Sequence, residues 1–147
     1  MEKPVRLVAF DADDLNVIGA LVQDAITKPA AVEYDPKSAR FSLLLNRFAW
    51  DAETKKSKRK KTHQRRQSAL SFARVKGVQS TGVKRGDDSQ ALSLLALRFS
   101  GADAPAGTIE IVFSDGPAIR LDVECVEAQL ADLGGAWETR FKPRHPA

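Results

Sequence analysis

The segment from Thr108 to Val123 places apolar side chains at every second position on both sides of one tight-turn dipeptide, Asp115-Gly116. An alternation of this period is typical of a strand with one buried face. The Asp-Gly pair predicts a two-residue hairpin turn, because it tolerates the positive φ angles that such a turn requires. The segment therefore predicts an antiparallel hairpin that needs further strands or a helix to cover its apolar face. These apolar positions are Ile109, Ile111, Phe113, Ile119, Leu121 and Val123.

Other segments repeat this pattern. A type I turn at Asp35-Pro36-Lys37-Ser38 joins two of them, because Asp and Pro are favoured at its first two positions. Leu92–Phe99 is apolar on both faces and predicts a central strand covered on each side. The predicted strands besides the hairpin are Val5–Phe10, Ala31–Tyr34, Arg40–Asn46, Ala69–Val75, Val78–Thr81 and Leu92–Phe99.

Two segments have the spacing of an amphipathic helix. The first begins after Asp11, whose carboxylate suits an N-cap, and Pro29 stops it. The second carries Val126, Leu130 and Leu133 at i, i+4 and i+7, with Gly134 as its C-terminal cap. We expect both helices to pack one face on the sheet.

These elements predict an α+β fold. We expect an antiparallel, strongly curved or barrel-like sheet of about seven to eight strands with two helices, an element order shared with pleckstrin-homology-like barrels. A chain of 147 residues, 43% hydrophobic and 29% charged, is long enough to bury a core without disulfides. The predicted organisation is a single domain over residues 1–135 with a basic loop at 51–67, followed by a basic C-terminal arm at 136–147.

Positive charge is concentrated in one stretch that contains no acidic residue. Without its eight cations the chain keeps 15 basic and 19 acidic residues, so the remainder has a net charge of −4 against +4 for the whole. This distribution predicts a localised polyanion-binding segment on a mildly acidic body. The eight residues are Lys55, Lys56, Lys58, Arg59, Lys60, Lys61, Arg65 and Arg66.

The basic segment has several interpretations. It could contact the phosphate backbone of RNA or DNA, including the ribosome, or an acidic protein or anionic lipid, or it could be a solvated loop without a partner. No Phe, Tyr or Trp lies between Asp51 and Ser71, so the loop itself cannot stack on bases. Phe48 and Trp50 at its base are either an aromatic platform or core residues at the end of the sheet. The candidate helpers in polyanion binding are Arg47, Trp50, Arg140, Lys142 and Arg144.

Residues that could carry catalysis or hold a metal are few. Cys125 has the carboxylates Glu124 and Glu127, and no cation, as near neighbours, which is not the electropositive surrounding of a reactive thiol, so we expect a structural cysteine. His63 and His145 lie in the basic loop and the C-terminal arm, where neither is placed to act as a base. We therefore predict no catalytic residue, no metal site and no cofactor.

Two further features of the sequence predict a cytoplasmic protein. The single cysteine excludes an intramolecular disulfide and fits a reducing cytoplasm. No apolar run approaches the length of about 20 residues that crosses a bilayer, so no membrane span is expected.

Four segments resemble proteins grouped as domain of unknown function 2948 in alphaproteobacteria. They are Leu45–Trp50, Leu92–Leu97, Ile119–Ala128 and Leu130–Gly134, of which the stretch from Ile119 to Gly134 is the most specific. The resemblance covers nearly the whole chain. It implies a bacterial, stand-alone cytoplasmic protein, and it transfers no activity, ligand or residue role to positions of this sequence.

The sequence thus predicts a small non-enzymatic accessory or binding protein that contacts a polyanion, RNA or DNA, through its Lys/Arg-rich loop. The alternative is a protein-interaction module that uses a sheet edge or a hydrophobic groove, in which case the basic loop is incidental.

Overall fold

The fold is that of a computed structural model, in which residues 4–48 and 65–133 are described. They form ten strands, one α-helix and one short 3-10 helix in chain order. The elements are β1 (Arg6–Ala9), α1 (Ala12–Val22), β2 (Ile26–Thr27), η1 (Pro29–Ala31), β3 (Val32–Asp35), β4 (Arg40–Phe48), β5 (Arg65–Phe72), β6 (Val75–Thr81), β7 (Leu92–Ser100), β8 (Gly107–Phe113), β9 (Ala118–Val123) and β10 (Ala128–Leu133).

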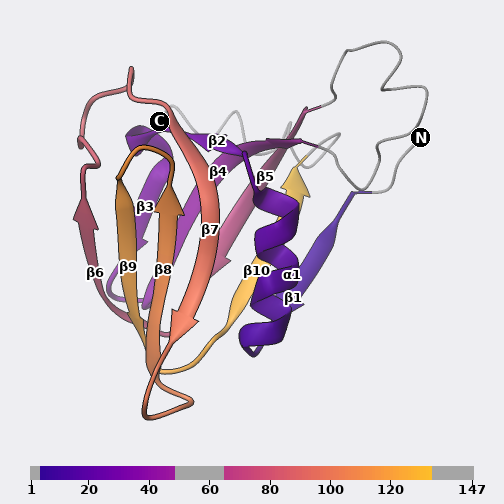
Figure 1. Ribbon diagram of the computed structural model, residues 1–147, viewed down its shortest axis with the longest axis vertical. Helices are drawn as coiled ribbons and strands as arrows, with labels where there is room; N and C mark the ends of the chain where they lie inside the picture. The colour runs from indigo at the N-terminus through magenta and orange to yellow at the C-terminus, as the bar shows by residue number, and fades with distance from the viewer. Residues whose placement is uncertain (1–3, 49–64, 134–147) are drawn as a thin grey trace.

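The strands form one antiparallel sheet in the order β1-β10-β5-β4-β2-β7-β8-β9-β6, with β3 pairing beside β4 (Figure 1). The two-residue strand β2 pairs with both β4 and β7 and so joins two halves. One half contains β1, β10, β5, β4 and β3, and the other contains β7, β8, β9 and β6. Long pairings such as the eight-residue register of β4 with β5 hold each half together.

Helix α1 packs on one face of this sheet and contacts β1, β4 and β7, so it bridges both halves. Asp11 is its N-cap and accepts a hydrogen bond from the Asp14 backbone N–H at 2.8 Å, as the sequence predicted. Leu15, Ile18 and Val22 are buried against the sheet. The helix ends at Val22, earlier than expected from Pro29, which instead begins η1.

The hairpin of β8 and β9 is confirmed, but its turn is three residues long and not two. The Phe113 N–H donates to the Pro117 carbonyl at 3.0 Å, which leaves residues 114–116 in the turn. Asp115 and Gly116 both adopt positive φ angles, 72° and 108°, as their residue types allow. The apolar side chains at alternate positions of the two strands are buried on the core face, while the intervening polar side chains lie on the opposite face.

The second predicted helix is wrong. Residues 128–133 form strand β10, which pairs with β1 on one side and β5 on the other. A short segment with Ala128, Leu130 and Leu133 fits either period, and the two neighbouring strands satisfy its backbone hydrogen bonds. Tertiary pairing therefore overrides the helical spacing.

The prediction of a strongly curved or barrel-like sheet is also wrong. The structure is mostly β, with a sheet of ten strands that is neither closed nor strongly curled, and one α-helix among the described residues. A pleckstrin-homology-like arrangement needs a C-terminal helix, and that helix is replaced by β10.

Strand β7 is buried mainly on one side, contrary to the predicted double cover. A β-bulge between Leu94 and Ala96 shifts the register by one residue. Leu97 therefore joins Leu92 and Leu94 among the buried residues, and Leu95 is 44% exposed. The sequence seems to have two apolar faces because the bulge moves the buried positions from even residue numbers (92 and 94) to an odd one (97).

Candidate functional site

A buried ionic cluster lies on the core face of β4, β5 and β10. Arg47 Nε donates to Asp132 Oδ1 at 3.0 Å and to Ser68 Oγ at 3.2 Å, and its Nη2 donates to Asp132 Oδ2 at 2.9 Å. The Ser68 hydroxyl donates to Asp132 Oδ1 at 2.6 Å. The Val5 backbone N–H completes the cluster by donating to Asp132 Oδ2 at 2.8 Å.

The cluster is closed to solvent, because the Arg47 and Asp132 side chains are 0% and 1% exposed. Burial raises the pKa of the Asp132 carboxyl, but the hydrogen bonds from Arg47, Ser68 and the Val5 N–H together with the Arg47 charge lower it further, so the net pKa falls below the usual 3.8. Asp132 is therefore an ionised partner of Arg47 at neutral pH.

Residues 1–3, 49–64 and 134–147, which the structure does not describe, all attach to strands at this end of the sheet. Phe48 and Arg65 are paired in register, so residues 49–64 connect the adjacent ends of β4 and β5. Leu133 pairs with Gln67, and residues 134–147 continue from it. The ends of β4, β5 and β10, at which these two stretches of the chain attach, are therefore neighbours in the sheet (Figure 1).

Most predicted polyanion-binding residues lie outside the described residues. These are Lys55, Lys56, Lys58, Arg59, Lys60 and Lys61, together with the helpers Trp50, Arg140, Lys142 and Arg144. The predicted loop ends earlier than expected, because Arg65 and Arg66 belong to β5. The Arg66 side chain is partly buried.

Arg47 was expected to help bind a polyanion at the surface, but it is buried. Its side chain points into the protein and pairs with Asp132, so the described structure does not present it to a ligand. Alternate residues of a strand face the same side of the sheet, and Arg47 follows the buried residues Phe41, Leu43 and Leu45 at this spacing along β4. It therefore points to the core face. The same applies to Asp132, which follows Ala128 and Leu130 on β10.

The charge of the described residues is opposite in sign to that of the rest. Residues 4–48 and 65–133 contain thirteen Lys and Arg and fifteen Asp and Glu, a net charge of −2. The whole chain carries +4, so the remaining residues contribute +6. The cationic excess therefore belongs to the segments that begin at or continue from the described strand ends.

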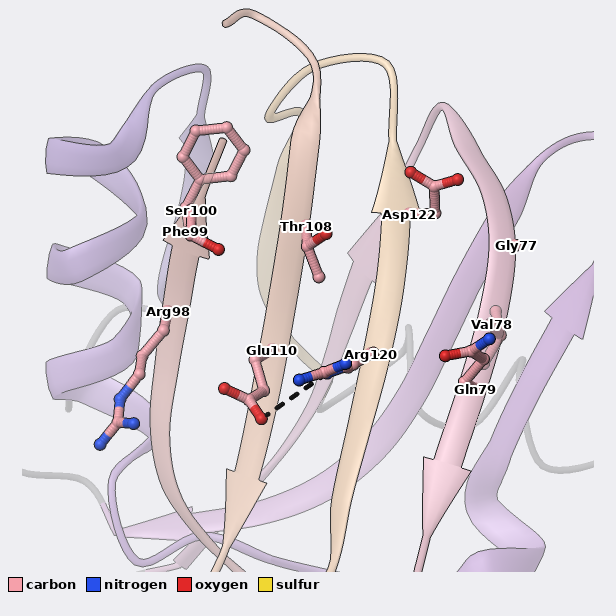
Figure 2. Close-up of a pocket in the computed structure, with 10 residues that line it drawn as sticks. All are labelled: Gly77, Val78, Gln79, Arg98, Phe99, Ser100, Thr108, Glu110, Arg120 and Asp122. Carbon is pink, nitrogen blue, oxygen red and sulfur yellow. Dashed lines mark ion pairs between the residues drawn. The ribbon is translucent and has the colours of Figure 1, made fainter. Parts of the chain in front are cut away.

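A second polar region covers the outer face of β7, β8, β9 and β6. It is an open depression of about 730 Å³. The register places Arg98, Glu110, Arg120 and Gln79 in one row across the four strands. Figure 2 shows Glu110 and Arg120 pointing toward each other, at 3.9 Å between Arg120 Nε and Glu110 Oε2, whereas Arg98 points away from them.

The chemistry of this outer face is that of a solvated sheet surface. Arg98 and Arg120 balance the carboxylates of Glu110 and Asp122, so the row attracts neither anions nor cations strongly. Arg120 is 62% exposed, which screens its pairing with Glu110. Among the described residues that line the depression there is no cysteine and no histidine, and no nucleophile–base pair is formed between them.

The remaining candidates have structural explanations. Cys125 is a free, partly buried thiol in the connection between β9 and β10, not on the predicted helix. Asp11 and Asp14 serve the start of α1. Within residues 4–48 and 65–133, no three His, Cys, Asp or Glu side chains come close enough to hold a metal ion. His63 and His145 lie outside these ranges.

The described helix is too short to cross a membrane, and no other helix in the described part of the chain could do so.

The fold and the site define a mostly β protein with one antiparallel sheet and a buried ionic cluster at one end. The chain belongs to the family described as protein of unknown function (DUF2948), whose model matches residues 5–145. The resemblance seen in the sequence is thereby confirmed at the level of the family. No curated protein and no solved structure matches the chain significantly.

Proposed function

We propose that this protein is a non-enzymatic binding protein that contacts the phosphate backbone of RNA or DNA through its basic segment, Lys55–Arg66. The observation that carries the proposal is the separation of charge. The described residues have a net charge of −2 and the remaining residues a net charge of +6. Six Lys and Arg residues lie on the connection between the paired strand ends Phe48 and Arg65.

The chemistry of this segment favours backbone contact over base recognition. Clustered Lys and Arg bind phosphates and release condensed counterions, which makes the affinity strongly dependent on salt. Without aromatic residues, the segment has no side chain that stacks on bases. The proposed binding is therefore tolerant of sequence, and a ribosomal or other structured RNA is as suitable a ligand as duplex DNA.

The test is fluorescence anisotropy with a labelled 20-base-pair RNA duplex, measured over a range of salt concentrations. The test variant replaces Lys58, Arg59, Lys60 and Lys61 by Ser. Its affinity should fall at least about tenfold. The slope of log K against log salt should decrease by up to about 3.6, because each phosphate that a cation neutralises contributes about 0.9. An unchanged melting temperature would show that the loss of affinity does not come from a loss of folding.

The matched control replaces four exposed cations of the described body by Ser, so that the net charge changes by the same amount. They are Lys28, Lys37, Lys84 and Arg85. The control should retain most of the affinity. Equal losses of affinity in the two variants, or no binding by the natural sequence, would overturn the proposal.

A second candidate function is protein recognition at the edge strand β1. Among the described residues β1 pairs with β10 alone, and Val8 and Phe10 beside this edge are 48% and 65% exposed. An open edge with apolar side chains suits the addition of a strand from a partner. A partner protein whose binding is lost on Phe10→Ser, and kept in the four-Ser loop variant, would support this candidate.

A further inference from the structure

The open sheet has two edge strands, at opposite sides of Figure 1, and they differ in how they are protected. Among the described residues, β6 pairs with β9 alone and β1 with β10 alone. Strand β6 has a β-bulge between Val75 and Gly77, and its Lys76, Gln79 and Ser80 are exposed. Bulges and exposed lysines are means by which proteins keep an edge strand from pairing with another chain. The β6 edge is therefore protected.

Strand β1 has neither of these protections. Its register with β10 is regular from Arg6 to Ala9. Arg6, Val8 and Phe10 are exposed, whereas Ala9 between them is fully buried. Two of the four large apolar side chains that are exposed among the described residues therefore lie at this one edge. An apolar, regular edge of this kind is suited to pairing with another strand.

The backbone of β1 offers hydrogen-bonding groups to such a strand. The Asp132 N–H donates to the Val5 carbonyl at 2.9 Å, so Val5 bonds to the β10 side. In an antiparallel ladder only every second residue bonds to a given neighbour. Leu7 therefore also bonds to β10, and the N–H and C=O groups of Arg6 and Val8 point to the open side of β1.

This edge is complementary to a second copy of itself. When two β1 strands pair antiparallel about a two-fold axis at Val8, this residue lies opposite Val8 of the second copy. The two residues then exchange main-chain hydrogen bonds, and their side chains pack together. Arg6 lies opposite Phe10 of the second copy on the same face, where a guanidinium group and an aromatic ring attract each other.

The residues that border the edge favour this register over its neighbours. A two-fold axis at Leu7 would place Phe10 opposite Pro4, which has no N–H to donate. An axis at Ala9 would place Arg6 opposite the first turn of α1. The axis at Val8 is the one that pairs the whole edge.

We propose that β1 is the interface of a homodimer, in which two β1 strands pair antiparallel about a two-fold axis at Val8 and join two sheets into one. The inference goes beyond RNA binding and does not depend on it. So short an edge buries less area than a standard interface of about 1,600 Å², so the dimer exchanges with the monomer.

The test is sedimentation velocity over about a hundredfold range of protein concentration, because dimerisation follows mass action. The protein is first treated with nuclease to remove any nucleic acid that bridges two chains. The average mass should rise from that of one chain toward that of two as the concentration increases. The four-Ser loop variant should behave in the same way, because its changes lie outside β1.

Val8→Lys tests the centre of the interface. It places two cations opposite each other across the axis, and the association constant should fall at least about tenfold. Gln79→Lys is the matched control, because Gln79 is exposed in the middle of the other edge strand. This control should dimerise like the natural chain. Circular dichroism establishes that both variants are folded.

Cross-linking tests the register and does not depend on the Lys variant. Single cysteines are introduced in a Cys125→Ser background and treated with a short bifunctional thiol reagent. Val8→Cys should cross-link with itself, and Arg6→Cys should cross-link with Phe10→Cys in a mixture of the two chains. Gln79→Cys should remain uncross-linked.

The outcomes separate this proposal from RNA binding. A chain that stays monomeric at every concentration, including one that binds a different protein at this edge, would overturn the dimer. So would equal losses of association in Val8→Lys and Gln79→Lys, or cross-linking of Gln79→Cys in place of Val8→Cys. None of these results bears on the effect of the four-Ser loop variant on RNA affinity.

Discussion

The two halves of the sheet each contain an arginine paired with a carboxylate, and the two pairs differ in almost every respect. Arg47 and Asp132 are 0% and 1% exposed and are joined at 2.9 Å with further bonds from Ser68 and Val5. Arg120 and Glu110 on the outer face are 62% and 33% exposed and are 3.9 Å apart. In this comparison the same two functional groups are paired inside the core in one half of the sheet and in water in the other.

This difference shows how burial determines what an ion pair does. An exposed pair gains little, because water and salt screen it and the side chains lose freedom on pairing. A buried pair is strongly coupled, because either partner left alone is an uncompensated charge in the core. We therefore expect the end of the sheet to depend on its pair and the outer face to be insensitive to its own.

The largest expected effect is that of Asp132→Asn. This change removes the ionised partner that Asp132 provides for the buried Arg47, and the free energy of unfolding should fall by about 3–5 kcal/mol. Urea denaturation followed by circular dichroism measures this decrease. Glu110→Gln is the matched control on the outer face. A decrease below about 1 kcal/mol for Asp132→Asn would show that the two pairs are equivalent.

A smaller effect is expected from acid. The pKa of Asp132 is lower in the folded protein than its ordinary value of 3.8, so its ionised form stabilises the fold above that pH. This contribution should be lost progressively as the pH falls below about 3.8 toward the folded pKa. Unfolding measured from pH 7 to pH 2 should show a steeper decline for the natural chain than for Asp132→Asn.

Asp87 provides the control for this pH dependence. Its pKa is also lowered, mainly by the hydrogen bond from the Ser89 side chain, but Asp87 is only partly buried and lies in the connection between β6 and β7. Asp87→Asn should therefore keep most of the acid-dependent decline. If Asp87→Asn removed that decline and Asp132→Asn did not, the assignment to the buried pair would be wrong.

The apolar double variant, with Arg47→Met and Asp132→Leu, should have a still smaller effect on stability. Because both charges are removed together, the free energy of unfolding should stay within about 1 kcal/mol of the natural value or rise above it. Urea denaturation of both single variants and the double variant gives the coupling energy. Additive effects of the two single changes would contradict a coupled pair.

The smallest effect is expected on the outer face. Arg120→Gln removes an exposed pair at 3.9 Å, and stability should change by less than about 0.5 kcal/mol. Thermal unfolding at low and high salt measures this. A decrease of about 2 kcal/mol or more would show that the row across β7, β8, β9 and β6 has a structural role that its exposure does not suggest.

Local signals in the sequence were sufficient for part of the fold. The hairpin around Asp115 and Gly116 and the Asp11 cap depend on residues close together in the chain. Both are present, although the turn has three residues where two were predicted. β10 was predicted as a helix because its pairing partners, β1 and β5, are distant in the sequence. The bulge after Leu94 was equally invisible, because it depends on pairing with β8.

The buried cluster was missed for a related reason, since Arg47 and Asp132 are 85 residues apart. A usable signal was nevertheless present. Arg47 follows Leu43 and Leu45 at period two, which is the phase of the buried face, and a charged residue in that phase needs a buried partner. Its nearness to the basic loop suggested a surface role instead. The loop residues themselves remain a prediction.

The most direct test of the account is to map where RNA binds, using amide chemical shifts of the isotope-labelled chain titrated with the duplex. We predict that among the described residues the shifts concentrate at the ends of β4, β5 and β10, around Arg66, Gln67 and Leu133. The amides of Thr108, Glu110 and Arg120 on the other half should not move. Shifts confined to that outer face, with none beside the strand ends, would contradict the central claim.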